Sequence, residues 1–166
     1  MPKILSIKQY PDPILLERAE EVGEITPEIR TLIMDMWETM DTLNGLGLAA
    51  TQVGVMKRVI VFKDGDGHNV ELINPEIMEF EGEVYQQESC FSIPGFSGVV
   101  KRYAAVTVRG LDMHGFERMY DSIITSVNAY ALQHEIDHLD GVLFIERDMN
   151  RQSRRAWQRF CKKRRW

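Results

Sequence analysis

The most informative segment of the chain is QHEIDH, residues 133–138, which places a glutamate directly after the first of two histidines. The surrounding residues 121–139 have the length and composition of a helix. At 3.6 residues per turn, His134 and His138 lie on the same helix face, so both imidazoles can bind one cation. A divalent ion held in this way lowers the pKa of a bound water toward ~7, and Glu135 is placed to act as general base and then general acid.

The same pattern has a structural alternative, in which two histidines lie on a surface helix beside a solvated glutamate. The chain contains only four histidines, so two that bracket a glutamate at this interval favour metal binding. His68 and His114 lie in turn sequences and are predicted to be solvated. The motif alone does not define the substrate, because several kinds of zinc peptidase use it, and residues 140–144 contain no third histidine.

A third ligand is predicted upstream, where Cys90 lies in the stretch ESCFSIPG, residues 88–95. A lone cysteine is more often a small buried hydrophobic residue than a ligand. A site with two histidines needs a third donor, however, and a thiolate with two imidazoles suits zinc or ferrous iron. Cys90 is therefore the predicted ligand. Cys161 is assigned to the apolar stripe of a C-terminal helix, and no disulfide is expected.

The remaining patterns predict an α+β protein rather than a regular βαβ repeat. Thr26 and Pro27 are typical of a helix start, and apolar residues at helical spacing continue to about Asn44. Turn sequences rich in aspartate and glycine occur at residues 64–67 and 112–115. The predicted strands are residues 58–62, 70–73, 79–85 and 104–111.

Length and composition favour one compact unit. The chain has 166 residues, of which 44% are hydrophobic, so the expected domain is 1–166, with a core at 1–148 and a basic helix at 149–166. The apolar runs are only a few residues long, and no membrane helix is expected. The N-terminus lacks the charged start and apolar stretch of a secretory signal, which predicts a cytoplasmic protein.

The formal net charge of −5 is unevenly distributed. Residues 151–166 contain eight lysines or arginines and no acid, which leaves −13 for residues 1–150. An acidic body argues against DNA binding over the whole surface, whereas the tail can meet an anionic partner locally. Asn150 is a candidate cap for a terminal helix with an apolar stripe around Trp157 and Phe160. Two alternatives stay open: a solvated helix docked by its aromatic residues, and a helix that binds a partner.

Three motifs occur together in a fixed order: GLGLAATQ at residues 45–52, ESCFS at 88–92 and QHEIDH at 133–138. In this combination they resemble the three motifs of the peptide deformylase family, and the resemblance extends to about residue 148. It implies an α+β fold with antiparallel or mixed sheets around the helix that carries H-E-x-x-H, plus a C-terminal helix. It also implies a metal-dependent hydrolase that removes the formyl group from formylmethionine of nascent polypeptides and releases formate. The usual ion of the family is Fe²⁺, and Zn²⁺, Ni²⁺ or Co²⁺ can occupy the same ligands.

The resemblance also assigns roles to individual residues. The residues assigned to the metal are Cys90, His134 and His138. Glu135 is the implied general acid and base, while Gln52 and the backbone N–H of Phe91 are the implied donors to the formyl oxygen as it becomes an oxyanion. A glycine at position 47 lets an extended substrate backbone come close. The residues expected to contact substrate are Gly47, Leu46, Glu88, Val127, Tyr130 and Ala131.

Four positions depart from the family pattern. Ser89 and Phe91 replace the glycine and the leucine that usually flank the metal-binding cysteine. Tyr130 and Gln86 stand where apolar residues are common, so the pocket for the methionine side chain is expected to differ. Tyr130 either narrows this pocket or packs at its edge with the hydroxyl bonded.

Two other functions fit parts of the pattern. A metallopeptidase that cuts internal peptide bonds shares H-E-x-x-H, but it usually has a further ligand downstream, which is missing here. A structural metal site in a binding module usually closes with four protein ligands, and only three are found. The basic tail resembles the C-terminal helix with which some bacterial deformylases contact the ribosome. The expected partners are therefore formylated nascent polypeptides and the ribosome, through residues 151–166.

Overall fold

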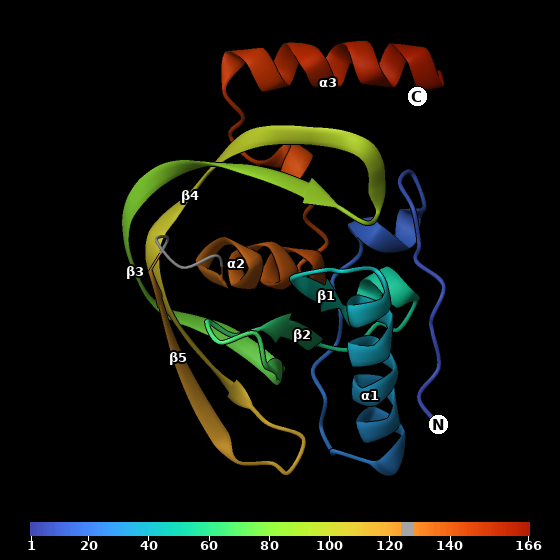
Figure 1. Cartoon of the computed structure of the whole chain (residues 1–166), viewed down its shortest axis with the longest axis vertical. Helices are drawn as coiled ribbons and strands as arrows, with labels where there is room; N and C mark the ends of the chain where they lie inside the picture. Colours follow the sequence, from blue (N-terminus) through green and yellow to red (C-terminus); the bar gives the residue numbers. More distant parts are fainter. Residues whose placement is uncertain (124–127) are drawn as a thin grey trace.

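A curved antiparallel sheet wraps around one helix (Figure 1). The computed structural model describes residues 1–123 and 128–166. The strands lie in the sheet in chain order: β1 (Gly47–Ala49), β2 (Val59–Lys63), β3 (Asn69–Cys90), β4 (Ile93–Leu111) and β5 (Glu117–Ile123). The helices are α1 (Pro27–Thr42), α2 (Asn128–Leu139) and α3 (Arg151–Arg164). Helix α2 lies inside the curve of the sheet, α1 packs beside β2, and α3 lies outside, against β4. The α+β class is confirmed.

Strands β3 and β4 are longer than the sequence predicts. Residues 70–73 and 79–85, predicted as two strands, belong to the single strand β3, which pairs first with β2 and then with β4. The pairing of β3 with β4 shifts register between Ile73 and Glu76, between Ile77 and Glu79, and between Ser89 and Cys90. Such irregularities bend a strand and increase its twist, so β3 and β4 are able to curl over α2.

Helix α1 begins where the sequence predicts and ends two residues earlier. The Thr26 hydroxyl accepts a hydrogen bond from the Ile29 N–H at 3.4 Å, and Pro27 occupies the first helical position. The buried face of α1, with Met36, joins an apolar cluster that includes Val61 of β2. This cluster fixes the edge of the sheet that carries β1.

The start of α2 differs from the prediction, which placed residues 121–139 in one helix. Residues 121–123 belong to β5, where Asp121 pairs with Thr107 of β4 and accepts a hydrogen bond from its hydroxyl at 2.8 Å. The cross-strand pairing holds these residues extended, and the described part of the helix runs from Asn128 to Leu139. Val127, predicted to contact substrate, lies outside the described residues.

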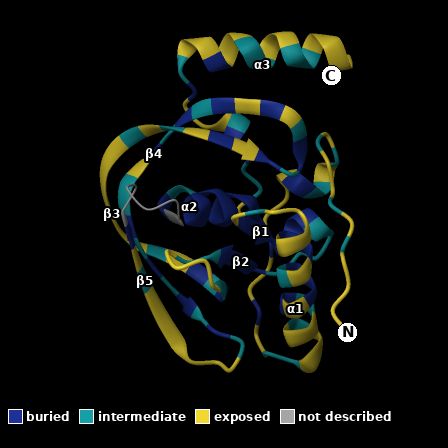
Figure 2. Cartoon of the chain, viewed as in Figure 1, coloured by how far each residue is buried: buried dark blue, intermediate teal, exposed yellow. Residues whose placement is uncertain are grey.

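Helix α2 is almost completely buried (Figure 2). Between residues 129 and 139, only Tyr130 keeps partial exposure. The apolar side of the helix, with Leu132 and Ile136, packs in a cluster with Phe62 of β2. The other side carries polar side chains at similar burial, and buried polar groups need hydrogen-bond or charge partners.

Helix α3 begins after Asn150, as predicted. Asn150 Oδ1 accepts a hydrogen bond from the Ser153 N–H at 2.9 Å, and Ser153 Oγ accepts one from the Val99 N–H of β4 at 2.7 Å. Trp157 and Phe160 pack in an apolar cluster with residues of β4, whereas all eight basic residues of 151–166 are exposed. No helix in the described part of the chain combines the length and apolar character needed to cross a membrane.

Candidate metal centre

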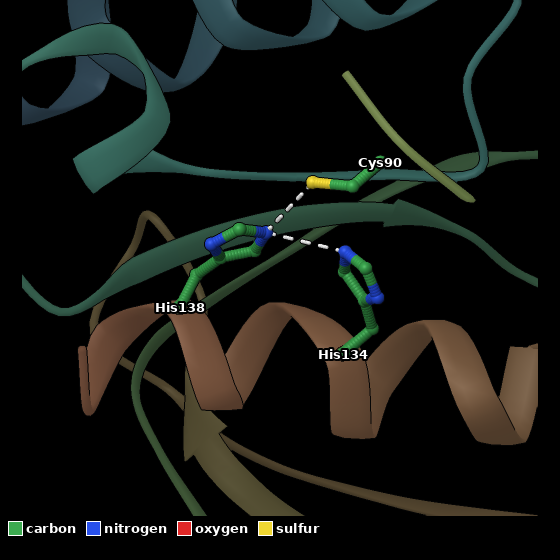
Figure 3. Close-up of side chains that lie close together, drawn as sticks. All are labelled: Cys90, His134 and His138. Atoms are coloured by element: carbon green, nitrogen blue, oxygen red, sulfur yellow. Dashed lines mark hydrogen bonds between the residues drawn. The ribbon is translucent and has the colours of Figure 1, made fainter. Parts of the chain in front are cut away.

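The polar side of α2 meets the end of β3 at a cluster of three metal-binding side chains (Figure 3). The Nε2 atoms of His134 and His138 lie 3.2 Å apart, and His138 Nε2 lies 3.3 Å from Sγ of Cys90. One ligand atom from each residue lies within 4.8 Å of the other two. A thiolate and two imidazoles directed at one point suit a single divalent ion such as zinc or ferrous iron. The structure thus brings the three predicted ligands together.

The turn between β3 and β4 aims Cys90. This residue ends β3 and pairs with Ile93, the first residue of β4, after the register shift that follows Ser89. Ser89 pairs with Ser97 as an ordinary strand residue, its side chain is exposed, and its φ is not positive. The glycine that the family pattern has here is therefore not required by the backbone of this chain.

A carboxylate holds the imidazole of His134. Nδ1 of His134 lies 2.8 Å from Oε1 of Glu88, which leaves Nε2 directed at the cluster. Arg102 donates from Nε and Nη2 to the two oxygens of Glu88 at 2.6 and 2.8 Å, and from Nη1 to Asp137 at 2.5 Å. Asp137 also pairs with Arg147, whose side chain is 46% exposed. A chain of charged contacts therefore leads from the candidate ligand His134 to the protein surface.

The charges in this chain stabilise one another. Burial by itself disfavours the carboxylate of Glu88, but hydrogen bonds from Arg102 and His134 outweigh it and hold the pKa of Glu88 below its ordinary value. Burial likewise disfavours the charged guanidinium, yet Glu88 and Asp137 raise the pKa of Arg102 above its ordinary value. Glu88 lines the cavity described below, as predicted for a substrate contact, although both of its oxygens are engaged by Arg102 and His134.

The two imidazoles have opposite pKa shifts. Burial opposes protonation of both. At His134, the sulfur of Cys90 and the carboxylate of Glu88 outweigh burial, and the pKa lies well above its ordinary value. At His138, burial and the positive charge on His134 hold the pKa well below its ordinary value. The environment therefore favours the charged form of His134 and the neutral form of His138.

Glu135 is 5% exposed and turns its carboxyl group toward β1. Burial raises the pKa of Glu135 to about 7, against the attraction of the charge on His134. A Cβ added to Gly47 would lie 2.7 Å from Oε1 of Glu135, so the glycine makes room for this carboxyl group. Among the described residues, Oε2 of Glu135 has no hydrogen-bond partner. A carboxyl group in this state can both accept and donate a proton near neutral pH.

Gln52 approaches the cluster from the short 3-10 helix Ala50–Val53. Its Oε1 accepts a hydrogen bond from the Ala49 N–H at 2.9 Å. Its Nε2 lies 3.2 Å from Oγ of Ser92 and 3.5 Å from Sγ of Cys90. The amide nitrogen thus faces the cluster, in the orientation that a donor to an oxygen in the cavity requires.

A cavity of about 500 Å³ opens beside the cluster. The predicted site residues among its walls are Leu46, Gly47, Gln52, Glu88, Cys90, Phe91, Tyr130, Ala131, His134 and Glu135. The walls also include Gln87 and residues 93–97, which the sequence does not single out. Phe91 extends its ring over Gly45, where an added Cβ would lie 2.5 Å from the ring. The large side chain at position 91 fits because position 45 has none.

Sequence reasoning missed two polar residues of this site. Arg102 lies within β4, outside both motifs that it connects, and no local pattern marks it. Ser92 belongs to the second motif, but its contact with Gln52 depends on the fold. The only available signal is Asp137 inside QHEIDH, because an acid on a buried helix requires a cationic partner. That requirement does not tell which arginine supplies the charge.

The family model for polypeptide deformylases matches residues 4–155 of the chain. The chain belongs to the polypeptide deformylase family. The peptide deformylase of Desulforudis audaxviator is 47% identical over 145 residues, covering 87% of this chain and 93% of that protein. The peptide deformylase of Thermodesulfovibrio yellowstonii is 48% identical over 148 residues, covering 87% and 88%.

Solved deformylase structures share the whole fold. The peptide deformylase of Thermus thermophilus has a TM-score of 0.87 at 35% identity, covering 96% of this chain and 94% of that one. The peptide deformylase of Ehrlichia chaffeensis in complex with actinonin has a TM-score of 0.86 at 36% identity, covering 99% of both chains. This deformylase is therefore a metal-dependent hydrolase that removes the formyl group from the N-terminus of nascent polypeptides. The predicted family, fold and reaction are confirmed.

Proposed function

We propose that this deformylase acts in the cavity beside Cys90, His134 and His138, and that these three residues hold one divalent ion. The supporting observation is the convergence of three metal-binding atoms, a buried carboxyl group and a buried amide donor on one cavity. Fe²⁺ is the proposed native ion, and Zn²⁺, Ni²⁺ or Co²⁺ is expected to occupy the same donors. When bound, the ion supplies Lewis acidity, which makes water nucleophilic near neutral pH.

Glu135 is proposed to carry the proton. As a carboxylate it accepts a proton from the attacking water, whose oxygen adds to the formyl carbon. Glu135 then donates this proton to the amine nitrogen while the C–N bond breaks, which leaves formate and a free N-terminus. A pKa of about 7 suits both transfers, because neither protonation state is strongly disfavoured at neutral pH.

Gln52 and the backbone N–H of Phe91 are proposed to stabilise the formyl oxygen as negative charge develops on it. The Gln52 amide is buried and faces Cys90, and Phe91 directly follows Cys90 in the turn between β3 and β4. Donors that are preorganised in a site from which water is excluded stabilise such an oxyanion by about 3–4 kcal/mol each.

The substrate is proposed to lie along Leu46 and Gly47 as an added strand. Strand β1 lies at the edge of the sheet, and Leu46 and Gly47 line the cavity, so a peptide backbone can pair with this edge. Tyr130, Ala131 and Val127 are proposed to contact the first side chain of the substrate. Tyr130 is partly buried at the cavity wall, so its phenol ring is proposed to shape this pocket.

Replacement of Glu135 by glutamine tests the reaction scheme. The variant cannot accept the proton, so turnover should fall by at least about 100-fold while the metal content stays unchanged. Formate released from a formyl-Met peptide measures turnover, and metal analysis after anaerobic purification measures the ion. Glu38→Gln on the exposed face of α1 is the control. Wild-type turnover in Glu135→Gln would show that Glu135 does not take part in the reaction. Cleavage of unformylated peptides by the wild-type enzyme would favour a peptidase.

The protein is proposed to act in a cytoplasm where nascent chains carry formylmethionine. The basic face of α3 is proposed to bind the ribosome there. All eight basic residues of 151–166 are exposed, while Trp157 and Phe160 hold the helix against the core. Contact with RNA phosphates predicts ribosome co-sedimentation that weakens as salt rises. The double variant Arg155→Glu/Arg159→Glu should lose it, whereas Lys3→Glu/Arg18→Glu, which reverses two exposed charges elsewhere, should not. Equal binding by both variants would exclude this docking mode.

A further inference from the structure

The orientation of the Gln52 amide is set at both ends. The side chain is 1% exposed. Its oxygen accepts the Ala49 N–H at 2.9 Å, so the nitrogen end must face the other way, toward Cys90. The nitrogen carries two hydrogens, and only one can be aimed at a given point in the cavity. The position of the second hydrogen therefore decides where the first one points.

The hydroxyl of Ser92 takes that second hydrogen. Ser92 is fully buried in the turn between β3 and β4, and its Oγ lies 3.2 Å from Nε2 of Gln52. The amide plane of Gln52 is thus held by an acceptor on one side and by Ala49 on the other. The remaining N–H of Gln52 is directed toward Sγ of Cys90 at 3.5 Å, beside the cavity.

One N-terminal segment ties the two partners together. The Lys8 N–H donates to the carbonyl of Gln52 at 2.7 Å, and the Tyr10 N–H donates to the carbonyl of Ser92 at 2.8 Å. These two bonds tie the 3-10 helix that carries Gln52 and the turn that carries Ser92 to the same N-terminal segment. The backbones that carry Gln52 and Ser92 are therefore held close to each other, which favours the contact between the two side chains.

We infer that Ser92 is a positioning residue for the reaction: its hydroxyl occupies one N–H of Gln52 and thereby holds the other N–H at the side of the cavity next to Cys90, where the oxygen of the substrate is proposed to lie. This inference rests on the proposed role of Gln52 as an oxyanion donor. Without the hydroxyl, the Gln52 amide keeps its bond to Ala49 but rotates more freely about that anchor. The loss is thus smaller than the loss caused by removing Gln52 itself, and it appears when charge develops on the oxygen rather than when substrate binds.

Ser92→Ala tests the inference by steady-state kinetics with a formyl-Met peptide. We expect kcat to fall roughly 10- to 30-fold, below the 10²- to 10³-fold typical of a deleted oxyanion donor, with KM changed less than about twofold. Metal content should match that of wild type. Ser122→Ala, which removes a buried hydroxyl of β5 that has no hydrogen-bond partner among the described residues, should leave kcat and KM unchanged. A wild-type kcat, or a rise in KM that accounts for the whole loss, would overturn the inference.

A double-mutant cycle separates the role of Ser92 from that of Gln52. Gln52→Leu keeps the buried volume but removes the donor, and in that background Ser92→Ala should have no further effect on kcat. An equal loss in both backgrounds would show that Ser92 acts independently of Gln52. A wild-type kcat for Gln52→Leu alone would refute the proposed role of Gln52, and the inference about Ser92 with it.

A measurement without turnover gives a second readout. In ¹⁵N-labelled protein, the side-chain NH₂ of Gln52, assigned by its loss in Gln52→Leu, should exchange slowly with solvent because both ends of the amide are held. Ser92→Ala should speed this exchange at least about tenfold, while Ser122→Ala should leave it unchanged. Equal exchange in Ser92→Ala and wild type would contradict the positioning role.

Discussion

Helices α2 and α3 are similar in length, yet they use polar residues in opposite ways. In α2, the side chains of Gln133, His134, Glu135, Asp137 and His138 are all buried. In α3, Ser153 is the only buried residue, and every arginine and lysine faces solvent. An apolar stripe explains how α3 docks, because its charged residues need no partner other than water. The burial of α2 cannot be understood without the partners of its polar side chains.

The difference between the two helices has an energetic basis. A charge taken out of water costs several kcal/mol unless other charges and hydrogen bonds compensate for it. Asp137 receives this compensation from Arg102 and Arg147, and His134 receives it from Glu88. The buried charges of the site therefore stabilise the fold only while every one of them keeps its partner. The tail has no such dependence.

The largest expected effect is the loss of Arg102. Arg102→Leu leaves the buried carboxylates of Glu88 and Asp137 without their shared cation, so it should lower the free energy of unfolding by roughly 3–5 kcal/mol. Because Glu88 then orients His134 less firmly, metal affinity should fall roughly 10- to 100-fold. Urea unfolding and metal titration measure the two effects.

Arg154→Leu on α3 is the matched control. The guanidinium of Arg154 is 58% exposed and lies 3.5 Å from Asp148, so its removal should change the free energy of unfolding by no more than about 0.5 kcal/mol. Similar unfolding curves for the two variants would mean that the buried network of Arg102 contributes no more to the free energy of unfolding than a surface ion pair does. The two helices would then not differ in this respect.

The same distinction explains what the sequence reveals about the site. The interval between His134 and His138 follows from helix geometry alone, and the identity of Cys90 follows from the need for a third donor. Both predictions concern residue types whose chemistry is rare enough to be recognised in isolation. Arg102 is different: arginines are common, and its role arises only because the long strands β3 and β4 curl over α2.

In the fold as well, features that depend on neighbouring residues were predicted correctly, and features that depend on distant residues were not. The cap at Thr26 and the turn at residues 64–67 are short-range features, and both appear as predicted. Residues 121–123 were predicted as helix but form a strand, since their pairing with β4 involves residues more than ten positions away. The joining of residues 70–73 and 79–85 into one strand depends in the same way on distant pairing.

A second, smaller effect is expected from the docking face of α3. The ring of Trp157 packs against Phe96 at 5.0 Å and Phe160 at 5.7 Å between centroids, and is only partly buried. Trp157→Ala should lower the free energy of unfolding by roughly 2 kcal/mol, less than for a fully buried tryptophan, and should leave metal content unchanged. Gln158→Ala, one residue along on the exposed face, is the control. A loss of metal in Trp157→Ala would show that α3 supports the site directly.

The smallest effect is expected where the two regions meet. Arg164 donates from Nη2 to the carbonyl of Pro94 at 3.2 Å, and Pro94 and Gly95 line the cavity that is proposed to bind substrate. The last turn of α3 therefore supports one wall of the cavity from behind. Because this hydrogen bond is exposed, Arg164→Ala should change the free energy of unfolding by less than about 0.5 kcal/mol.

The wall borders the proposed substrate cavity but carries none of the proposed reacting groups, so its loosening is expected to weaken substrate binding without slowing the chemical step. Arg164→Ala should raise KM roughly two- to threefold, equivalent to about 0.4–0.6 kcal/mol, at unchanged kcat. Lys163→Ala, one residue earlier and also exposed, should leave both parameters unchanged. If Arg164→Ala instead lowered kcat, the tail would act on the reacting groups themselves, and the division between the two helices would need to be redrawn.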